Sequence, residues 1–466
     1  MDRRAFLKKL AATGFSLSFL PVCGAQTKSK PPNVVLMLAD DMGYADLACY
    51  GGKAKTPNLD KLASEGVRFT SCYAGAPNCS PSRAALMTGR FPTRAGIYSY
   101  IPANSKIIPH HPMHLTTAET TVATLLKNAG YDTCHVGKWH LSKLNSDQPQ
   151  PKDSGFDHSL GTSNNAEPSH KDPVNFVRNG VEVGPMKGYS CQIVVNEAIQ
   201  WLSNRKTADK PFFLYVAFHE PHKKLASPPE MQRQYAHAPE EDKLYLANIQ
   251  NLDDAAGRLL TALDRMNLCD NTFVFFTSDN GPWRQGSQGN IRGKKAAVYE
   301  GGIREPGIIR WPGMVKPGTV SNQPVHATDF LPTVCSITGV QQPKDRVIDG
   351  MDLSALLKGK PWKRSKPLYW YFYRAKPQAA LRESDWVLIA YQKHHSMPKT
   401  HRLVQQDIDF IKNAQWEKFE LYNIAEDPSQ QHDLAAEQPQ RLSPMKKTLT
   451  DLHKEIIKDV PHWPWK

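Results

Sequence analysis

The sequence predicts an α/β protein in which helices cover a large central mixed sheet, followed by a smaller C-terminal unit. Three apolar runs, at 34–39, 212–218 and 272–277, have the length and composition of buried strands. Each run ends in polar or ionisable residues, and helical patterns separate the runs along the chain. Alternating strands and helices are typical of a layered α/β domain, which we expect over residues 31–360.

The remaining elements of this region follow the same alternation. A fourth strand is predicted at 131–136, directly after a helix that should end at Gly130, because glycine favours helix C-termini. Open α/β sheets bind ligands at the carboxyl ends of their strands, so the polar strand ends predict one site built from distant parts of the chain. The helices are predicted at 59–65, 118–129, 194–204 and 244–266.

The sequence pattern changes after about residue 360. Short apolar stretches at 368–373, 386–391 and 419–422 are typical of antiparallel strands, and residues 442–458 have an amphipathic helical pattern. We therefore predict a smaller α+β subdomain with an antiparallel sheet over residues 361–466.

Residues 1–25 have the features of an export signal. Arg3-Arg4 precedes an apolar run at 10–22, which resembles a twin-arginine signal and is too short for a membrane-spanning helix. The signal could be removed in either of two ways. One is ordinary cleavage near Cys23, and the other is cleavage at a lipoprotein box, which would leave Cys23 acylated. We expect an exported protein, periplasmic or extracellular, whose only membrane contact would be such an N-terminal lipid anchor.

The basic balance of the chain limits the classes of partner. The formal net charge is +13, spread along the sequence without a block of five basic residues. A solvated basic surface accounts for most of these residues, and attraction to a polyanion is the functional alternative. No nucleic-acid-binding module is recognisable, whereas a sulfated polysaccharide would be attracted by the same field. The eight cysteines lack the paired spacing of zinc sites.

The most informative motif is Cys79-Ser80-Pro81-Ser82-Arg83, followed by a stretch that favours a helix. A cysteine at a helix N-terminus beside a guanidinium suits a reactive thiol or an anion site. The string, extended through Gly89 and Arg90, resembles the signature of the type I sulfatases. In that family the cysteine is oxidised to formylglycine, and the hydrated aldehyde is the nucleophile.

The resemblance covers about residues 31–460 and is greatest to the arylsulfatase A and N-acetylgalactosamine-6-sulfatase branch, bacterial and secreted in this case. The segment 270–281, which ends in Asp279-Asn280-Gly281, carries much of it. It implies an alkaline-phosphatase-like layered α/β/α domain for residues 31–360, and maturation by a formylglycine-generating or anaerobic maturation enzyme.

Two pairs of strand-end residues are candidate metal ligands. Asp40-Asp41 and Asp279-Asn280 would each suit a polar turn, but their oxygen atoms also suit a divalent cation. The resemblance implies that these four residues bind Ca²⁺, with the modified residue 79 completing the site. Ligands that are all oxygen favour Ca²⁺ or Mg²⁺ over zinc, and we expect Ca²⁺ rather than Mg²⁺.

Further site residues are carried over from the family motifs. Lys138 and His140 lie in Gly137-Lys138-Trp139-His140, and in an extended segment they would point the same way. The resemblance implies that Lys138 contacts the sulfate and that His140 contacts the diol or the sulfate, with a role as base in the breakdown of the intermediate. Alignment of the strand at 212–217 selects His222 as the catalytic histidine and leaves His219 as a local structural residue. Of two adjacent lysines, Lys295 has the family spacing to Glu300 and should contact sulfate, while Lys294 should face the surface or the substrate.

These residues predict hydrolysis of sulfate esters, on a sulfated carbohydrate or another small sulfate ester. Ca²⁺, Arg83, Lys138 and Lys295 would stabilise the anionic transition state, and His222 would protonate the leaving alcohol. The alternatives are a phosphate monoester, diester or phosphonate hydrolase of the same superfamily, and a non-catalytic sulfoglycan-binding protein. Substrate selectivity is expected in the loops 98–114, 142–170 and 223–240.

Overall fold

The computed structural model describes residues 30–102, 113–207, 209–374, 376–393 and 405–461. The described residues from Pro31 onward form one compact unit. The predicted export signal and Cys23 lie outside the described residues. None of the helices in the described ranges combines the length and the apolar character that a membrane crossing requires.

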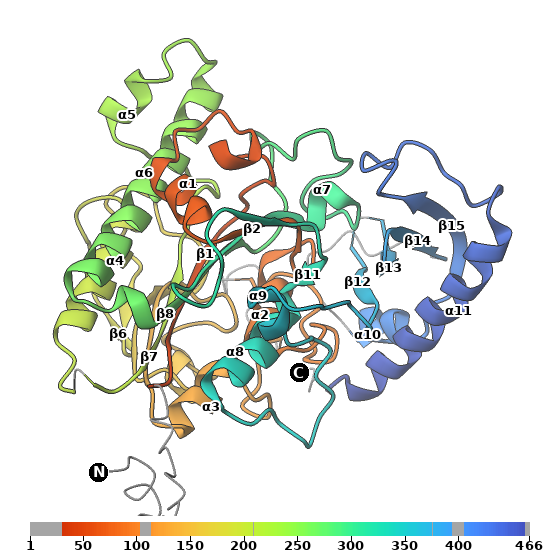
Figure 1. Ribbon diagram of the computed structural model, residues 1–466, viewed down its shortest axis with the longest axis horizontal. Coiled ribbons are helices and arrows are strands. Elements are labelled where there is room, and N and C mark those ends of the chain that lie inside the picture. Colours follow the sequence, from red (N-terminus) through yellow and green to blue (C-terminus); the bar gives the residue numbers. More distant parts are fainter. Residues whose placement is uncertain (1–29, 103–112, 208, 375, 394–404, 462–466) are drawn as a thin grey trace, which may run out of the picture. The chain divides into compact units, whose positions relative to one another are not determined.

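A large mixed sheet forms the centre of this unit (Figure 1). Its middle strands β8, β1, β7, β3 and β4 are parallel, whereas β9 runs antiparallel to both of its neighbours, β2 and β8. Within the described residues it has eleven strands, with β11 (Val325–His326) paired to β2 and the others ordered as follows: β10 (Thr319–Ser321), β2 (Val67–Tyr73), β9 (Arg304–Arg310), β8 (Thr272–Ser278), β1 (Asn33–Ala39), β7 (Phe212–Ala217), β3 (Asp132–Lys138), β4 (His158–Thr162), β5 (Val177–Arg178) and β6 (Val181–Glu182).

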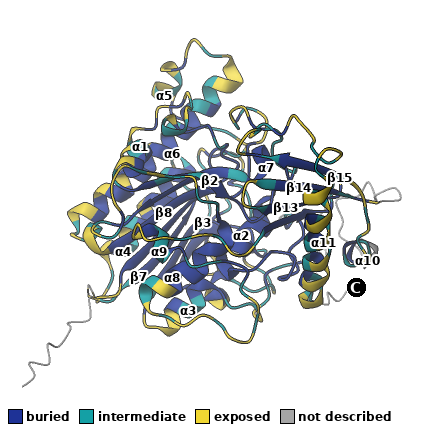
Figure 2. Cartoon of the chain, turned by 45° about the vertical axis from the view of Figure 1, so that its right-hand side comes forward, coloured by how far each residue is buried: buried dark blue, intermediate teal, exposed yellow. Residues whose placement is uncertain are grey.

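Helices cover both faces of this sheet, because the middle strands are apolar on both faces. Val34, Leu36 and Leu38 of β1 face one hydrophobic core, and the alternate residues Val35 and Met37 face the other. The buried strands therefore lie between two helical layers (Figure 2). The layer on the Val35 face contains α1 (Pro57–Ser64), α4 (Ser190–Ser203) and α6 (Glu240–Arg265), and the layer on the Leu36 face contains α2 (Cys79–Thr88), α3 (Val122–Asn128) and α8 (Phe330–Thr338).

Short elements connect these layers. Along the chain, α5 lies between β7 and α6, α7 directly precedes β9, and α9 lies between α8 and β12. Their bounds are α5 (Pro229–Arg233), α7 (Glu300–Ile303) and α9 (Ser354–Leu357), with 3-10 turns η1 (Ala48–Tyr50), η2 (Pro151–Ser154), η3 (Cys269–Asn271), η4 (Ala327–Asp329) and η5 (Ile457–Asp459).

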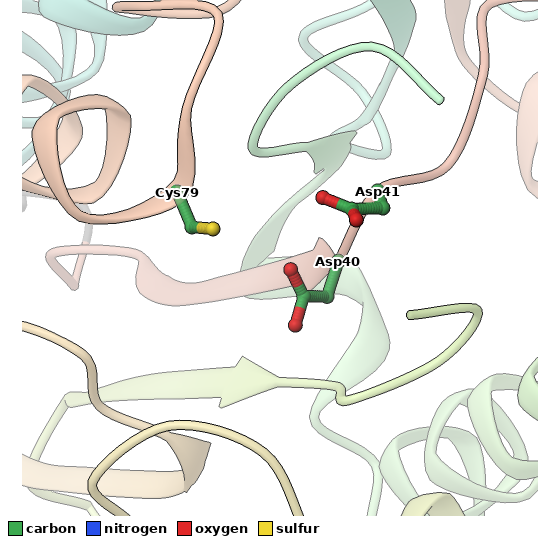
Figure 3. Close-up of side chains that lie close together, drawn as sticks. All are labelled: Asp40, Asp41 and Cys79. Carbon is green, nitrogen blue, oxygen red and sulfur yellow. The ribbon is translucent and has the colours of Figure 1, made fainter. Parts of the chain in front are cut away.

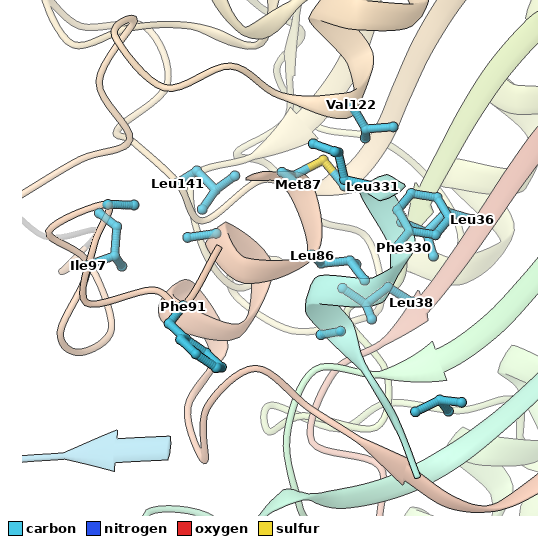
Figure 4. Packing of buried hydrophobic residues seen from close by; sticks show 14 of the residues in the cluster. Leu36, Leu38, Leu86, Met87, Phe91, Ile97, Val122, Leu141, Phe330 and Leu331 are labelled. Atoms are coloured by element: carbon cyan, nitrogen blue, oxygen red, sulfur yellow. The ribbon is translucent and has the colours of Figure 1, made fainter. Parts of the chain in front are cut away.

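Helix α2 is held firmly by the core beneath it. Leu86 and Met87 lie among Leu36, Phe330 and Leu331, and all of these side chains are buried (Figure 4). Full burial of a side chain of this size contributes about 1.5–3 kcal/mol. This packing fixes the position of Cys79, the first residue of the helix.

A second, four-stranded antiparallel sheet follows in the C-terminal part of the chain. Together with the large mixed sheet between helices, it confirms the predicted fold class. The domain boundary near residue 360 stays a prediction. This sheet has the order β12 (Leu368–Phe372), β13 (Gln378–Glu383), β14 (Trp386–Gln392) and β15 (Trp416–Asn423), accompanied by α10 (Gln405–Lys412) and α11 (Pro439–Ile456).

Some details differ from the prediction, two of which have a clear local cause. The helix expected from residue 118 begins at Val122, because Thr121 is extended and its hydroxyl accepts a hydrogen bond from Thr124 N at 3.0 Å as the helix N-cap. Strand β13 was not predicted, since its sequence Gln-Ala-Ala-Leu-Arg-Glu has no β-branched or aromatic residue. It becomes a strand because β12 and β14 pair with both of its edges.

Candidate active site

The centre of the site lies at the carboxyl ends of β1 and β8. These strands are parallel neighbours in which Ala39 is paired with Ser278, so the residues that follow each strand meet. Asp40 and Asp41 follow β1, and Asp279 and Asn280 follow β8. Asp41 N donates a hydrogen bond to Asp279 Oδ1 at 3.2 Å, and Asn280 Nδ2 donates to Asp41 Oδ1 at 2.7 Å. The two predicted pairs of ligands are therefore adjacent in space.

Cys79 faces this carboxylate group from the first turn of α2. Its thiol and one carboxylate oxygen each of Asp40 and Asp41 lie within 4.8 Å of one another (Figure 3). All three residues are buried. A helix N-terminus carries a partial positive charge, so this position favours negative charge that develops on residue 79.

Three cationic side chains surround the carboxylates. Arg83 donates to Asp279 Oδ2 from Nε at 2.9 Å and from Nη2 at 2.7 Å, and its Nη1 donates to the carbonyl of Lys138. Lys138 Nζ donates to Asp40 Oδ2 at 2.6 Å. Lys295 Nζ donates to Asp41 Oδ1 at 2.5 Å and lies 3.4 Å from Cys79 Sγ. The cations are therefore close enough to residue 79 to contact an anion bound beside it.

The carboxylates of Asp40 and Asp279 oppose each other's ionisation. Burial raises the pKa of Asp40, but Lys138, His222 and Arg83 outweigh it, and the pKa falls well below its ordinary value. Burial and the charge of Asp40 raise the pKa of Asp279 to about 6, in spite of Arg83. Such a crowded carboxylate group would be stabilised by a divalent cation.

Unpaired oxygen atoms show that these residues fit a metal ion. Asp40 Oδ1 and Asn280 Oδ1 are buried and have no hydrogen-bond partner among the described residues. Buried polar oxygens are rarely left without a partner, and hard oxygen ligands of this kind are those that Ca²⁺ prefers. Asp40, Asp41, Asp279 and Asn280 would hold such an ion, as the family resemblance implies.

The thiol of Cys79 is poorly suited to act as a nucleophile without modification. Burial raises the pKa of Cys79, and although Lys138 and Lys295 act in the opposite direction, they do not cancel this effect. The thiolate is the reactive form of cysteine, so a raised pKa makes the unmodified side chain less reactive. The environment is consistent with a different functional group at this position.

The two histidines after β7 have different surroundings. His222 Nε2 lies 3.4 Å from Asp41 Oδ2, at the centre of the site, while its Nδ1 contacts the carbonyl of Lys223 at 2.5 Å. Burial lowers the pKa of His222 more than Asp41 raises it. His219 is fully buried, and its Nε2 lies 2.7 Å from the Thr162 hydroxyl. These contacts agree with a structural His219 and leave His222 as the histidine beside the carboxylates.

His140 approaches the site from a bent backbone. Strand β3 ends at Lys138, and His140 has φ of 56°, so the expected extended alternation does not continue to it. Its Nε2 lies 2.9 Å from the carbonyl of Ile101, and its Nδ1 is buried without a partner. Asp41 and Ala296 also have positive φ, at 63° and 70°. Non-glycine residues rarely adopt this conformation, and it is concentrated at functional sites.

Some contacts of the site were not predicted. The carbonyls of Ile101 and Lys138 orient His140 and Arg83, and no side-chain pattern could have indicated them. Lys294 does not extend freely into solvent, because its ammonium donates to the carbonyl of Arg284 at 2.8 Å. Lys294 thereby fastens the loop that precedes Lys295.

Comparisons with known proteins identify relatives along most of the chain. The sulfatase family model matches residues 32–340, and the model of the N-sulphoglucosamine sulphohydrolase C-terminal region matches residues 293–459. N-acetylgalactosamine-6-sulfatase of Canis lupus familiaris is 36% identical over 396 residues, which cover 78% of this chain and 73% of the relative. Human arylsulfatase A is 36% identical over 372 residues, covering 74% and 71%.

Solved structures show a similar fold. The crystal structure of Ps i-CgsB has a TM-score of 0.81 and 27% identity, over 93% of this chain and 94% of that chain. The complex of Ps i-CgsB with k-i-k-neocarrahexaose has a TM-score of 0.79 and 28% identity over the same shares.

Proposed function

The chain belongs to the sulfatase family and is a sulfuric ester hydrolase, and from this premise we propose that it removes sulfate from a sulfated carbohydrate. The proposal includes formylglycine at position 79 and a bound Ca²⁺. The observation that carries it is the convergence of Cys79, four oxygen ligands and three cations at one buried point.

The bound cation has a defined place in this proposal. Asp40, Asp41, Asp279 and Asn280 would hold Ca²⁺, which when bound supplies positive charge next to the sulfate group. Adding a cation would also free Lys138 and Lys295 from their present carboxylate partners, since the carboxylates would then bind the metal. The two ammonium groups would be available for the sulfate oxygens.

The modified residue explains why cysteine alone is insufficient. A hydrated aldehyde at position 79 would have two hydroxyl groups. One would attack sulfur while the sulfur–oxygen bond to the alcohol breaks, and the other would lose its proton and re-form the carbonyl while the carbon–oxygen bond to sulfate breaks. Neither a thiol nor a single hydroxyl group offers this second step. The fixed first turn of α2 aims residue 79 toward the cations that would stabilise the transferred group.

The chain's own side chains stabilise charge and move protons. Arg83, Lys138 and Lys295 supply preorganised positive charge, which is worth most in a buried site that excludes water. We propose that His222 protonates the leaving alcohol. Burial lowers the pKa of His222, and the negative charge of a bound sulfate ester would raise it and so favour the protonated imidazole. His140, with its buried and unpartnered Nδ1, is placed to contact the bound sulfate group.

A carbohydrate is the proposed substrate class because of the relatives and the charge of the chain. One relative named above is N-acetylgalactosamine-6-sulfatase, and the structure of Ps i-CgsB was also solved in complex with k-i-k-neocarrahexaose. The net charge of +13 favours approach of a polyanionic glycan. Export through the N-terminal signal, with or without a lipid anchor at Cys23, would place the enzyme where such polymers are met.

The test is turnover by the matured protein. The chain would be produced with a formylglycine-generating or anaerobic maturation enzyme and screened against defined sulfated mono- and oligosaccharides, measuring free sulfate. An aryl sulfate and its matched aryl phosphate would be compared in parallel. Release of sulfate from a sugar supports the proposal, whereas higher kcat/KM for the aryl phosphate would favour a phosphate hydrolase instead.

A further inference from the structure

A cavity of about 740 Å³ lies at the carboxyl edge of the large sheet, on the β4 side of the candidate site. We call it the side cavity. Part of its lining comes from loops that follow β3, β4 and β7, three neighbouring parallel strands. Its lining residues are Lys143, Leu144, Asn145, Ser163, Asn164, Asn165, Glu167, Val174, Asn175, Val177, Glu182 and Lys224.

The same loops carry the candidate catalytic residues. Lys143 lies three residues beyond His140, and Lys224 lies two residues beyond His222. Asn164 follows Thr162, which is paired with Lys138 in the β3–β4 register. Thr162 Oγ1 also donates to the carbonyl of Asn164 at 2.6 Å. The side cavity is therefore built on the same loops that carry His140 and His222, and its lining begins within three residues of each of them.

The walls of the side cavity are fixed by hydrogen bonds. Leu144 N donates to Ser163 Oγ at 2.9 Å, which joins the loops after β3 and β4. Asn175 links two further segments, because its Nδ2 donates to Asn165 O at 2.9 Å and its Oδ1 accepts from Glu167 N at 2.9 Å. A site that is already ordered loses less conformational entropy when a ligand binds.

Several polar groups on these walls have no protein partner. Among the residues that the structure describes, no hydrogen bond or ion pair is recorded for Lys143 Nζ or for the side-chain amide of Asn164. Asn165 Oδ1 is also unpaired, but it is shielded from solvent and so is not counted among the groups open to a ligand. The ammonium of Lys143 can donate, and the amide of Asn164 can both donate and accept, which suits a ligand that carries hydroxyl groups.

The charges of the lining indicate the class of ligand. Lys224 pairs with Glu167, and Glu182 accepts a hydrogen bond from Asn145 Nδ2 at 3.1 Å. The two lysines and two glutamates cancel in formal charge. Amides, a hydroxyl and exposed Val174 in a charge-balanced cavity fit the hydroxyl groups and apolar face of a sugar ring better than a second sulfate group.

We propose that the side cavity binds the uncharged sugar residue joined to the sulfated one, so that the preferred substrate is an oligosaccharide and not a monosaccharide. Lys143 and Asn164 would bind its hydroxyl groups. This inference rests on the proposed sulfatase function and adds the part of the substrate that lies beyond the sulfate ester.

The experiment compares substrates that do and do not reach the side cavity. The substrates are a sulfated disaccharide with a neutral neighbouring sugar, the sulfated monosaccharide alone, the analogue whose neighbouring sugar carries a carboxylate, and 4-nitrophenyl sulfate. Lys143→Ala and Asn164→Ala would be compared with Lys152→Ala, which removes an exposed lysine from the same part of the chain outside the lining. Thermal unfolding of each variant would establish that it is folded.

We expect the wild type to prefer the disaccharide, and each lining variant to lose about tenfold in kcat/KM on it, mostly through KM. Activity of these variants on 4-nitrophenyl sulfate, and all activities of Lys152→Ala, should be unchanged. Equal rates on mono- and disaccharide, or unchanged disaccharide kinetics in both lining variants, would overturn the inference. Preference for the carboxylate analogue would replace the neutral sugar by an acidic one and overturn the stated class.

The same experiment distinguishes failure of the proposed sulfatase function from failure of the side-cavity inference. If the matured wild type releases no sulfate from any of these compounds, including 4-nitrophenyl sulfate, the sulfatase proposal itself fails. If 4-nitrophenyl sulfate and the monosaccharide are hydrolysed without any gain from the second sugar, only the side-cavity inference fails.

Discussion

Two clusters of charge within the described residues, each with buried side chains at its centre, differ in what their charged atoms contact. The strand-end cluster consists of Asp40, Asp41, Asp279, Arg83, Lys138 and Lys295. The C-terminal cluster joins the loop after α2 to the end of α11 and to η5, and it consists of Arg90, Arg94, Asp349, Glu455 and Asp459.

In the C-terminal cluster the acidic groups are paired by the arginines, and among the named residues Arg90 Nε is the buried atom without a hydrogen-bond partner, while Arg90 Nη1 pairs with Glu119. Both oxygens of Asp349 accept hydrogen bonds from Arg94, and Oδ2 also accepts from Phe91 N at 2.6 Å. Arg94 also reaches Glu455 and Asp459, each at 2.9 Å. Such a network holds two parts of the chain together, and its aspartate has no oxygen left over for a ligand.

In the strand-end cluster, by contrast, some buried oxygen atoms accept no hydrogen bond from the protein. Asp40 Oδ1 and Asn280 Oδ1 accept no hydrogen bond among the described residues although both are buried, and Asp40 Oδ1 has only the more distant Arg83 Nη2 at 3.8 Å. Cys79 Sγ lies beside the carboxylates. Burial and charge are common to the two clusters, so neither property identifies a functional site. The difference is the set of unsatisfied atoms that converge on one point, and each prediction below tests that difference.

The largest effect is expected at residue 79. Cys79→Ala removes the nucleophile, and turnover should fall at least about 1,000-fold while the fold is kept, because α2 is held by its own core contacts. Mass spectrometry of the active wild-type peptide should show formylglycine in place of the thiol. Full activity with cysteine alone at this position would contradict the proposed chemistry.

Removal of the metal should have a comparable effect on turnover. Asp40→Asn keeps the shape of the side chain but removes a charged oxygen ligand, so metal binding and activity should be lost together. Added Ca²⁺ should also stabilise the wild type toward thermal unfolding, by about 2.7 kcal/mol at 100 times the dissociation constant. The variant should lack this shift. Unchanged activity after exhaustive chelation would reject the metal assignment.

The replacement of His222 should have a smaller and selective effect. His222→Ala should lower kcat/KM on an alkyl sugar sulfate by roughly 100- to 10,000-fold, because a sugar alkoxide needs a proton to leave. Loss on 4-nitrophenyl sulfate should be much smaller, since nitrophenolate is a good leaving group. His219→Ala is the matched control. Selective loss in that control, or equal losses on both substrates for His222→Ala, would show that the acid is misassigned.

Much of the fold could be predicted because the middle strands are continuous apolar runs. Strands β1, β7 and β8 are buried on both faces, and their sequences show it directly. Strand β9 was missed because it contains Pro306 and Gly307, residues that weaken the strand pattern. It pairs with β2 and β8 through contacts that no local pattern encodes.

The candidate site, like the fold, has features that local sequence motifs predict and features that depend on contacts between distant segments. Its side chains lie in short motifs at strand ends, and the structure brings Asp40, Asp279 and Cys79 together as those motifs indicate. The carbonyl of Ile101 beside His140 and the side cavity depend on how distant loops meet. The loops 142–170 and 223–240, expected to carry substrate selectivity, contribute much of the cavity lining, but the cavity itself and the backbone contacts could not be predicted because they leave no signature in the identity of single residues.

The smallest expected effect on catalysis, and the sharpest test of the comparison, is at Arg94 in the C-terminal cluster. The side chain of Arg94 is 1% exposed and contacts Asp349, Glu455 and Asp459. Arg94→Ala should therefore destabilise the fold by about 3 kcal/mol, since it leaves the buried Asp349 without its cation. Lys447→Ala, which breaks an exposed pair with Asp451 on α11, is the control and should leave the unfolding temperature nearly unchanged.

In both variants kcat/KM of the folded fraction should equal that of the wild type, because neither residue reaches the strand ends. Chemical denaturation and turnover measured on the same preparations would test this separation. A large loss of kcat in a fully folded Arg94→Ala protein would mean that the C-terminal cluster acts on the site, and that satisfied ion pairs do not mark a purely structural role.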